Sequence, residues 1–388
     1  MKQFAGFVIL MCFIHIGIAQ SLTFNAGGTA QKNYYAEIPY EIVKDKIIVP
    51  AVVNGQVRKF ILDTGAPNLI FESLYRELHP YIIRKVNVGD ANGKRDSLVM
   101  VDLPAISFGD ISFNDVPTLV SKDTVMKACF GVDGLIGSNM LRGSIVQFAS
   151  ASKKIIITDD IKKLTVSSKN ASKIVFPDRQ SSPYITVKIG RSNEVLLFDT
   201  GSDDLYALCM DHFDIFKKAD VIQIKATGYG SDTFSNAGLG NNTTLYRFII
   251  PSLRINQSEL KHVVSETTSD NKSRIGAPLL HYGIVTIDYP NGKFYFEPFH
   301  PSASAREINW TITPVVINQK LVVGSIWTDI LRQQVQTGDQ IIAIDGVTYE
   351  TVNLCDILLN PILKDKTKAI LTIKDQQGNV KQVEIVKE

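Results

Sequence analysis

The stretch Phe60–Ala66, which reads FILDTGA, and its near copy Leu196–Ser202, which reads LLFDTGS, decide the fold of this chain of 388 residues. In each copy three apolar residues lead to an Asp-Thr-Gly triplet. This pattern predicts a buried strand that delivers an acid to a tight, glycine-assisted turn. A single copy would be explained equally well as ordinary turn chemistry, because Asp and Gly favour turns for reasons unrelated to catalysis. Two copies in matching surroundings indicate a duplicated site.

The similarity between the two copies extends well beyond the triplets. Upstream, a strand-like stretch and a turn end at Gly55 or Gly190, which precede the acids by 8 and 9 residues. Downstream, an Ile-Gly pair ends at Gly137 or Gly276, 74 and 77 residues after the acids. Self-similarity at one fixed spacing is the mark of a repeated structural unit. The sequence therefore predicts two β-rich lobes built to one plan.

These motifs resemble the pepsin and retropepsin class of aspartic proteases, over about residues 40–300. In that family each lobe gives one Asp from an Asp-Thr-Gly triplet, and a later apolar-apolar-Gly segment runs beside it. The resemblance implies a mainly β, bilobal, pepsin-like double β-barrel. It places Leu135–Gly137 beside Asp63 and Ile275–Gly276 beside Asp199. The second copy departs from the pattern at Arg274, where the family has an apolar residue.

Paired acids suggest a specific chemistry. Two carboxylates held close cannot both ionise cheaply, so the pair shares one proton and titrates as a unit. The charged member can take a proton from a water that attacks a peptide carbonyl, while the protonated member donates to the carbonyl oxygen. Asp63 and Asp199 are therefore the predicted catalytic residues of an aspartic endopeptidase acting on peptide or protein substrates. We expect no metal, cofactor or covalent intermediate.

The predicted supporting residues surround the two acids: Thr64, Gly65, Thr200, Gly201 and Ser202. The glycines allow tight backbone, and the resemblance implies that the threonine hydroxyls tie the two loops together. It also implies that the Ser202 hydroxyl bonds the outer oxygen of Asp199, whereas Ala66 offers no such bond to the other acid. Loss of a hydrogen bond to the charged form raises a pKa. We therefore expect activity to extend toward mildly acidic or neutral pH.

A hairpin over the cleft is expected by resemblance, and the candidate is Val88–Lys94, with basic residues on both sides. Residues 82–128 contain no Tyr, so this flap would resemble the plainer retropepsin kind. A simple exposed hairpin turn with charged edges explains the same residues equally well.

The amino end carries one positive charge and an apolar run at Phe4–Ile18, followed by Ala19. This predicts a signal peptide of residues 1–19. About 15 apolar residues fall short of the roughly 20 that span a bilayer, so no membrane span is expected. Met11 before Cys12 is too large for a lipoprotein cleavage site. We expect export without lipidation, to the periplasm or outside the cell, in a bacterium.

Near the carboxyl end, Gly338–Gly346 reads GDQIIAIDG and follows the strand-like Lys320–Ile326. Over about residues 308–388 this resembles a PDZ domain, a small α/β unit. PDZ domains add an extended peptide to a sheet edge and hold its terminal carboxylate. The resemblance therefore implies a C-terminal peptide ligand. Trp310–Thr313 stands where the family has a Gly-rich loop, so docking on the lobes, plain packing and a generic small β domain stay open.

The predicted domains follow from these segments: a signal peptide at 1–19, an N-terminal lobe at 20–165, a C-terminal lobe at 166–303 and a PDZ-like domain at 304–388. One chain carries both acids, so a monomer suffices. The net charge is +2, from 41 basic and 39 acidic residues, and does not indicate a nucleic-acid partner. Residues 21–45 are either an inhibitory pro-segment or simply the first strand.

The cysteines and histidines predict neither a disulfide framework nor a metal site. Beyond the signal lie Cys129, Cys209 and Cys355, one in each predicted domain. An odd count permits one bridge at most, and an isolated Cys is more often a small buried apolar residue, so no disulfide framework is expected. The histidines lack metal-ligand spacing. The alternative function is a non-catalytic protein that binds peptides in the same cleft and through the PDZ-like domain, although such a protein has no evident need for paired acids.

Overall fold

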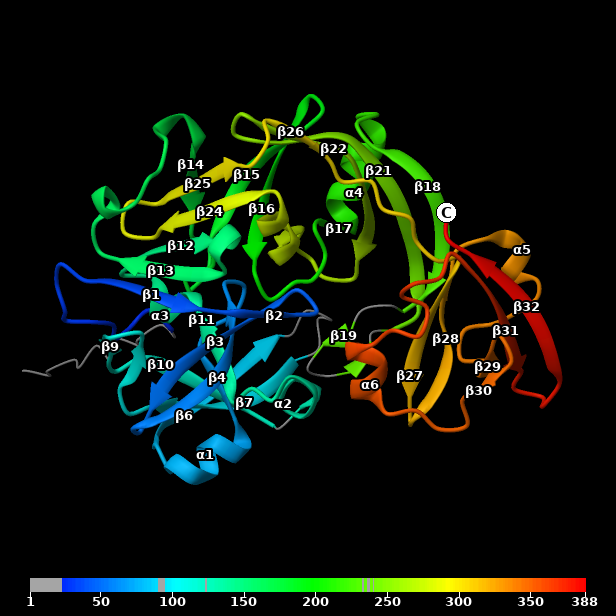
Figure 1. Cartoon of the computed structure of the whole chain (residues 1–388), viewed down its shortest axis with the longest axis horizontal. Coiled ribbons are helices and arrows are strands. Elements are labelled where there is room, and N and C mark those ends of the chain that lie inside the picture. The colour runs from blue at the N-terminus through cyan, green and yellow to red at the C-terminus, as the bar shows by residue number, and fades with distance from the viewer. Residues whose placement is uncertain (1–22, 90–94, 123, 232–233, 236–237, 240) are drawn as a thin grey trace, which may run out of the picture.

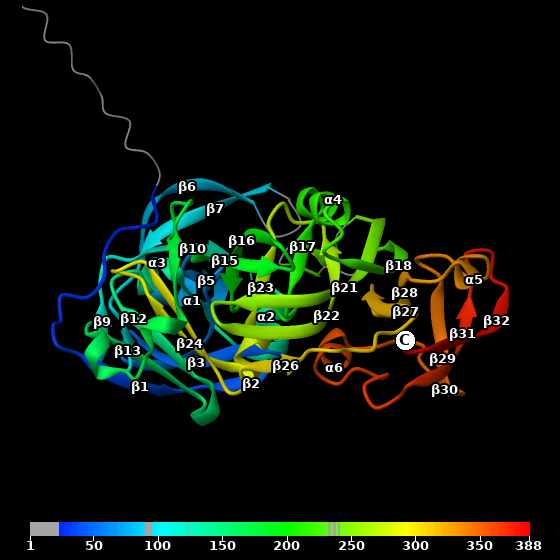
Figure 2. The ribbon, with the colours of Figure 1, turned by 90° about the horizontal axis from the view of Figure 1, so that it is seen from above.

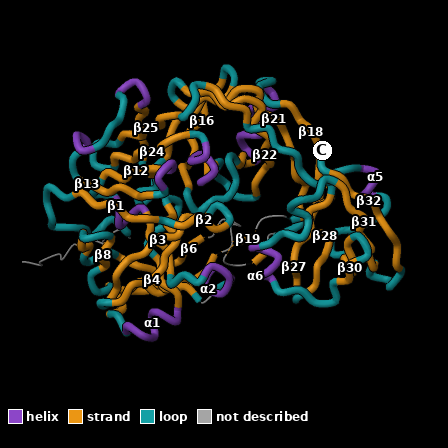
Figure 3. The backbone as a smooth tube through the Cα atoms, in the orientation of Figure 1, coloured by secondary structure: helices purple, strands orange, loops and turns teal. Residues whose placement is uncertain are grey.

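The computed structural model describes residues 23–388 apart from 90–94, 123, 232–233, 236–237 and 240. Strands dominate and the helices are short, which confirms the expected mainly β class (Figure 3). The predicted signal peptide and the tip of the predicted flap lie outside the described residues. Within the described part of the chain, no helix has the length and apolar character needed to cross a bilayer.

The first lobe is built on one ten-stranded sheet. Its strands are β2 (Glu41–Val43), β3 (Lys46–Val53), β4 (Gln56–Asp63), β5 (Leu69–Phe71), β6 (Tyr81–Gly89), β7 (Arg95–Asp102), β8 (Ile106–Phe108), β9 (Ile111–Phe113), β10 (Pro117–Ser121) and β11 (Gly134–Gly137). Three helices accompany them: α1 (Glu72–Leu78), α2 (Val125–Phe130) and α3 (Ser138–Leu141). The strand order is β6-β7-β10-β5-β11-β4-β3-β8-β9, with β2 on β3. The strand that ends at Asp63 therefore lies inside the sheet.

The second lobe repeats this plan. Its strands are β15 (Tyr184–Ile189), β16 (Ser192–Asp199), β17 (Ala207–Cys209), β18 (Gln223–Gly230), β19 (Phe234–Ser235), β20 (Gly238–Leu239), β21 (Thr243–Ile255), β22 (Ser258–Thr268), β23 (Arg274–Gly276) and β26 (Ser302–Ser304), with helix α4 (Met210–Lys218). In the first lobe β11 runs parallel to β4 and antiparallel to β5. In the second, β23 runs parallel to β16 and antiparallel to β17. The duplicated spacing in the sequence thus becomes a duplicated strand pairing.

A further set of strands joins the lobes. They are β1 (Tyr35–Pro39), β12 (Ile145–Ala149), β13 (Lys154–Thr158), β14 (Ala171–Val175), β24 (Gly283–Asp288) and β25 (Lys293–Pro298). They pair antiparallel in the order β1-β13-β12-β24-β25-β14, so that β12 and β24 meet in the middle. Short 3-10 turns lie at the edges: η1 (Ser150–Ser152), η2 (Ile161–Lys163), η3 (Ser168–Asn170) and η4 (Ala277–His281). One apolar cluster runs through both lobes, which the shared sheet holds together.

The carboxyl-terminal unit, residues 310–388, has its own core. Its elements are β27 (Ile312–Ile317), β28 (Lys320–Ile326), α5 (Asp329–Arg332), β29 (Gln340–Ile344), β30 (Val347–Thr348), α6 (Leu354–Leu359), β31 (Lys368–Lys374) and β32 (Val380–Val386). The unit lies at one end of the molecule, beside both lobes (Figures 1 and 2). Strand β28 pairs with β18 of the second lobe. A PDZ-like identity and the domain boundaries stay predictions.

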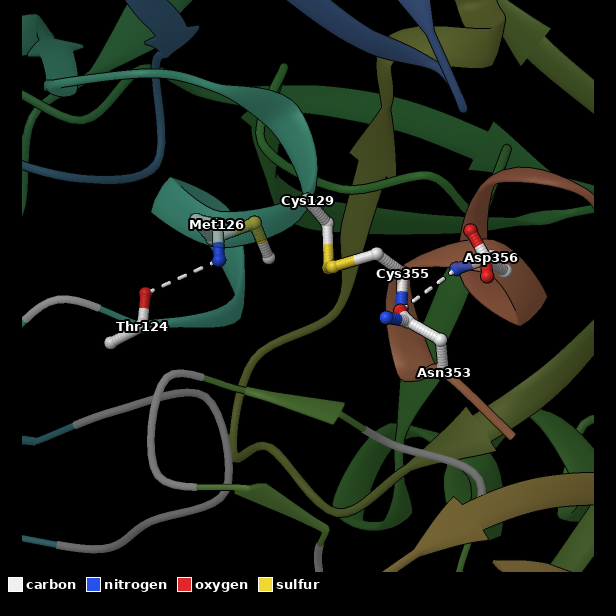
Figure 4. Close-up of a disulfide and its surroundings, with 6 residues drawn as sticks. All are labelled: Thr124, Met126, Cys129, Asn353, Cys355 and Asp356. Atoms are coloured by element: carbon white, nitrogen blue, oxygen red, sulfur yellow. Dashed lines mark hydrogen bonds between the residues drawn. A yellow bond between two sulfur atoms is a disulfide. The ribbon is translucent and has the colours of Figure 1, made fainter. Parts of the chain in front are cut away.

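The odd number of cysteines permits one bridge, and the structure contains one. Cys129 in α2 and Cys355 in α6 form a disulfide, which joins the carboxyl-terminal unit to the first lobe (Figure 4). The partners are 226 residues apart. They meet because α6 packs on the first lobe, where Leu358 and Leu359 contact an apolar cluster. The spacing of the two cysteines along the sequence does not reveal that they lie close together in the fold. Cys209 is free and buried, as an isolated Cys was expected to be.

Candidate active site

Both triplets stand where a buried strand ends. The residues that lead to Asp63, Phe60 to Leu62, are at most 2 % exposed. Strand β11 places Gly137 opposite Asp63, and β23 places Gly276 opposite Asp199. A Cβ at Gly276 would overlap the backbone of the loop that follows Asp199, and one at Gly137 would overlap the loop after Asp63. The Ile-Gly repeats in the sequence therefore mark the close approach of a strand to each acid loop.

The two threonines lock the loops to each other. Thr64 N donates to Thr200 Oγ1 and Thr200 N donates to Thr64 Oγ1, both over 3.0 Å. Each hydroxyl then donates across the lobes, Thr64 Oγ1 to Phe198 O over 2.6 Å and Thr200 Oγ1 to Leu62 O over 2.7 Å. Both threonines are fully buried. Four bonds related by an approximate twofold axis fix the position of one acid relative to the other.

The two carboxyl groups face each other across this lock. A Cβ added to Gly65 would lie 2.5 Å from Asp199 Cγ, and one added to Gly201 would lie 2.5 Å from Asp63 Cγ. Each glycine thus leaves room for the carboxyl group of the other lobe. Each also donates to its own acid, Gly65 N to Asp63 Oδ1 and Gly201 N to Asp199 Oδ1, both over 2.9 Å.

Burial and neighbouring charges shift the pKa of Asp63. Burial, and then the charge of Asp199 and a hydrogen bond with it, raise the pKa of Asp63 to about 7. The Gly65 amide and the charge of Lys46 act in the opposite direction but are outweighed. With a pKa of about 7, Asp63 keeps its proton up to nearly neutral pH.

Each acid loop also accepts a hydrogen bond from the opposite lobe. Lys46, buried at the start of β3, donates to the carbonyl of Gly201 and lies 3.6 Å from Asp203. Gln180, which precedes β15, donates to the carbonyl of Gly65 over 3.0 Å. The donor to the Gly201 carbonyl is the charged Lys46, whereas the donor to the Gly65 carbonyl is the neutral Gln180. Sequence reasoning missed both residues, because neither lies in a repeated motif and each contact spans more than 100 residues.

Arg274 was missed as a member of the site, although its departure from the apolar pattern was visible. Its Nη1 lies 3.4 Å from Asp199 Oδ2, and its other amino group contacts Asp270. A charged residue at the apolar position of the segment expected beside the acid is the signal that could have revealed it. The contact found for the Ser202 hydroxyl within the described residues is with Asp204 N, at 3.4 Å. The bond from Ser202 to Asp199 stays a prediction.

A family model described as aspartyl protease matches residues 49–140. The match runs from β3 to α3 and includes the first triplet and its Ile-Gly pair. No curated protein matches the chain. The family match and the mainly β architecture together support an aspartic protease family and a protease-type function.

Each lobe also carries a long antiparallel hairpin. In the first lobe β6 pairs with β7 up to Gly89 and Arg95, and residues 90–94 of the flap candidate lie outside the described residues. The second lobe carries the counterpart, β18 with β21, which closes at Gly230 and Thr243. Strand β18 also reaches the carboxyl-terminal unit. Within the described residues, no group of three or more His, Cys, Asp or Glu side chains could hold a metal ion.

Proposed function

We propose that this protein is an exported aspartic endopeptidase that hydrolyses peptide bonds through the dyad of Asp63 and Asp199. The observation that carries the proposal is the mutual approach of the two carboxyl groups, each seated against the glycine of the other loop. The reciprocal threonine bonds support it, since catalytic groups must be held within a fraction of an ångström. A pure binding protein has no evident need for such a pair.

In the proposed mechanism a water molecule is held between the two carboxyl groups. The ionised acid takes a proton from this water as its oxygen attacks the peptide carbonyl, and the protonated acid stabilises the charge that develops on the carbonyl oxygen. A pKa of about 7 for Asp63 supports this division, because the group stays protonated as pH rises until about pH 7. Activity is therefore expected to fall as pH rises through about 7.

The proposal includes an extended peptide as substrate, with cleavage between apolar side chains by analogy with the family. It also includes a monomer, export by the amino-terminal segment, and a carboxyl-terminal unit of the PDZ kind that binds peptide ends. The separate apolar core of that unit and its pairing with β18 support an independent module placed beside the lobes.

The proposal is tested with the purified exported chain, residues 20–388, and a mixed peptide library at pH values from 3 to 8. We expect cleavage by the wild type and by Asp110→Asn, a control that alters an exposed carboxylate. Neither Asp63→Asn nor Asp199→Asn should cleave. Cleavage that persists unchanged in both variants would contradict the proposal. Saturable binding of peptides without cleavage at any pH would favour the alternative of a peptide-binding protein.

A further inference from the structure

The two lobes share one strand plan, but the two halves of the site differ at one equivalent position, Leu135 in the first lobe and Arg274 in the second. Leu135 stands two residues before Gly137, and β11 pairs it with Ile61, beside the Asp63 strand. Arg274 stands two residues before Gly276, and β23 pairs it with Leu197, beside the Asp199 strand. The same place in the two lobes is therefore apolar next to one acid and cationic next to the other.

The arginine is held firmly in its place. Its side chain is 13 % exposed, and it joins Asp199 Oδ2, over 3.4 Å, to Asp270. Burial raises the pKa of Asp270, while Arg274 and Lys272 act to lower it. A guanidinium does not lose its proton in proteins, so a fixed positive charge lies against Asp199. Both side chains are largely buried, so little water reaches this contact to screen the charge.

Other charged groups around the dyad do not cancel this asymmetry. Lys46 approaches from β3, but its ammonium group is bound to the Gly201 carbonyl and paired with Asp203. Its effect on the pKa of Asp63 is smaller than that of burial and of Asp199. Asp204, on the loop after the second triplet, adds negative charge toward Arg274. Leu135 brings no charge to the side of Asp63.

We propose that Arg274 is a positioning residue that keeps Asp199 as the ionised member of the dyad and leaves the shared proton on Asp63. This rests on the proposed function and deepens it, because it assigns the two roles. Asp199 would take the proton of water as the water oxygen bonds to the peptide carbon, and Asp63 would give its proton to the carbonyl oxygen. On collapse, the amine takes the proton from Asp199 as the C–N bond breaks, and a hydroxyl returns one to Asp63.

The location of the proton can be observed directly by carboxyl carbon NMR on the exported chain labelled at aspartate Cγ. The signals of Asp63 and Asp199 are assigned by their loss in the corresponding Asp→Asn variants. At mildly acidic pH we expect Asp199 at the ionised position and Asp63 at the protonated position, with the Asp63 signal changing near pH 7. Because this measurement needs no turnover, its result is independent of whether the chain cleaves peptides.

The decisive variant is Arg274→Leu, which gives the second lobe the residue of the first. We expect the Asp199 signal to move toward the protonated position, and Arg274→Lys to restore most of the wild-type pattern. If the leucine variant does not fold, Arg274→Gln keeps the size of the side chain without its charge. Arg254→Leu removes an exposed arginine that pairs with Glu259 on the surface, and should change neither signal.

Kinetics give a second measurement. Loss of the cation makes the first ionisation of the dyad harder. The acidic limb of the kcat/KM profile in Arg274→Leu should therefore move to higher pH by about one unit, since an opposite charge at this range shifts titration by roughly one to three units. Three outcomes would overturn the proposal: a proton on Asp199 in the wild type, unmoved carboxyl signals in a folded neutral variant, or a changed KM for acidic peptides with an unmoved pH profile.

Discussion

At the scale of single residues, the position of each acid depends on a hydroxyl from the other lobe. Thr200 Oγ1 accepts from Thr64 N and donates to Leu62 O. Thr200→Val keeps the shape of the side chain but leaves both backbone groups without a partner in a fully buried place. We expect a loss of about 2 kcal/mol or more in the free energy of unfolding. We also expect a loss of roughly 100-fold in kcat, because small displacements of catalytic groups are costly.

Denaturant unfolding and peptide hydrolysis measure these two effects. Thr200→Ser is the control, because it keeps the hydroxyl and should keep most of both quantities. A valine variant with normal kcat would mean that the cross-lobe bonds do not position the acids.

The sequence was sufficient to place the acids, the threonines and the glycines, because each belongs to a motif that occurs twice. Lys46 and Gln180 could not be found in this way. Their partners are the carbonyls of Gly201 and Gly65 on the opposite lobe. A backbone carbonyl leaves no residue-specific signal, and no repeat reports a contact between lobes. Arg274 is an intermediate case. The sequence showed it as an exception to the apolar-apolar-Gly pattern but did not reveal that it contacts Asp199.

At the scale of elements, the sheet of the second lobe continues into the carboxyl-terminal unit, because β18 pairs with β28. Gly230 at the end of β18 pairs with Ser325 of β28. Its φ is +144°, a conformation that side chains rarely adopt, and a Cβ would overlap the carbonyl oxygen of Gly324. The sequence predicted β28 from the strand-like Lys320–Ile326 but gave no prediction for β18. The pairing of β18 with β28 could not be predicted, because a sheet edge can be covered by any strand that tertiary packing brings to it.

We therefore expect Gly230→Ala to separate the two strands and to expose the segment that links the second lobe to the unit. Limited proteolysis should then cut near Arg306 faster than in the wild type. Gly143→Ala is the matched control, since a Cβ there meets no atom within 4 Å. Equal rates of cutting in the two variants would show that the contact between β18 and β28 does not hold the unit.

At the scale of the whole molecule, the carboxyl-terminal unit is fastened to both lobes. On the second lobe Arg247 lies 4.0 Å above the ring of Trp327, and Arg332 donates to Thr227 O over 2.6 Å. On the first lobe α6 packs against an apolar cluster, and Cys355 is bonded to Cys129. The unit thus bridges the lobes on one side, in addition to the sheet in which β12 pairs with β24.

Loss of the disulfide should weaken this bridge without altering the dyad. A disulfide that closes a long loop contributes about 2 to 4 kcal/mol in typical cases, mainly by restricting the unfolded chain. We expect Cys355→Ser to unfold at lower denaturant concentration than the wild type, and reductant to lower the wild type to the same midpoint without further effect on the variant. Cys209→Ala keeps the bond and should stay sensitive to reductant. A wild-type midpoint that reductant leaves unchanged would mean that the two cysteines are not joined, and that the packing of α6 holds the unit on the first lobe without a covalent bond.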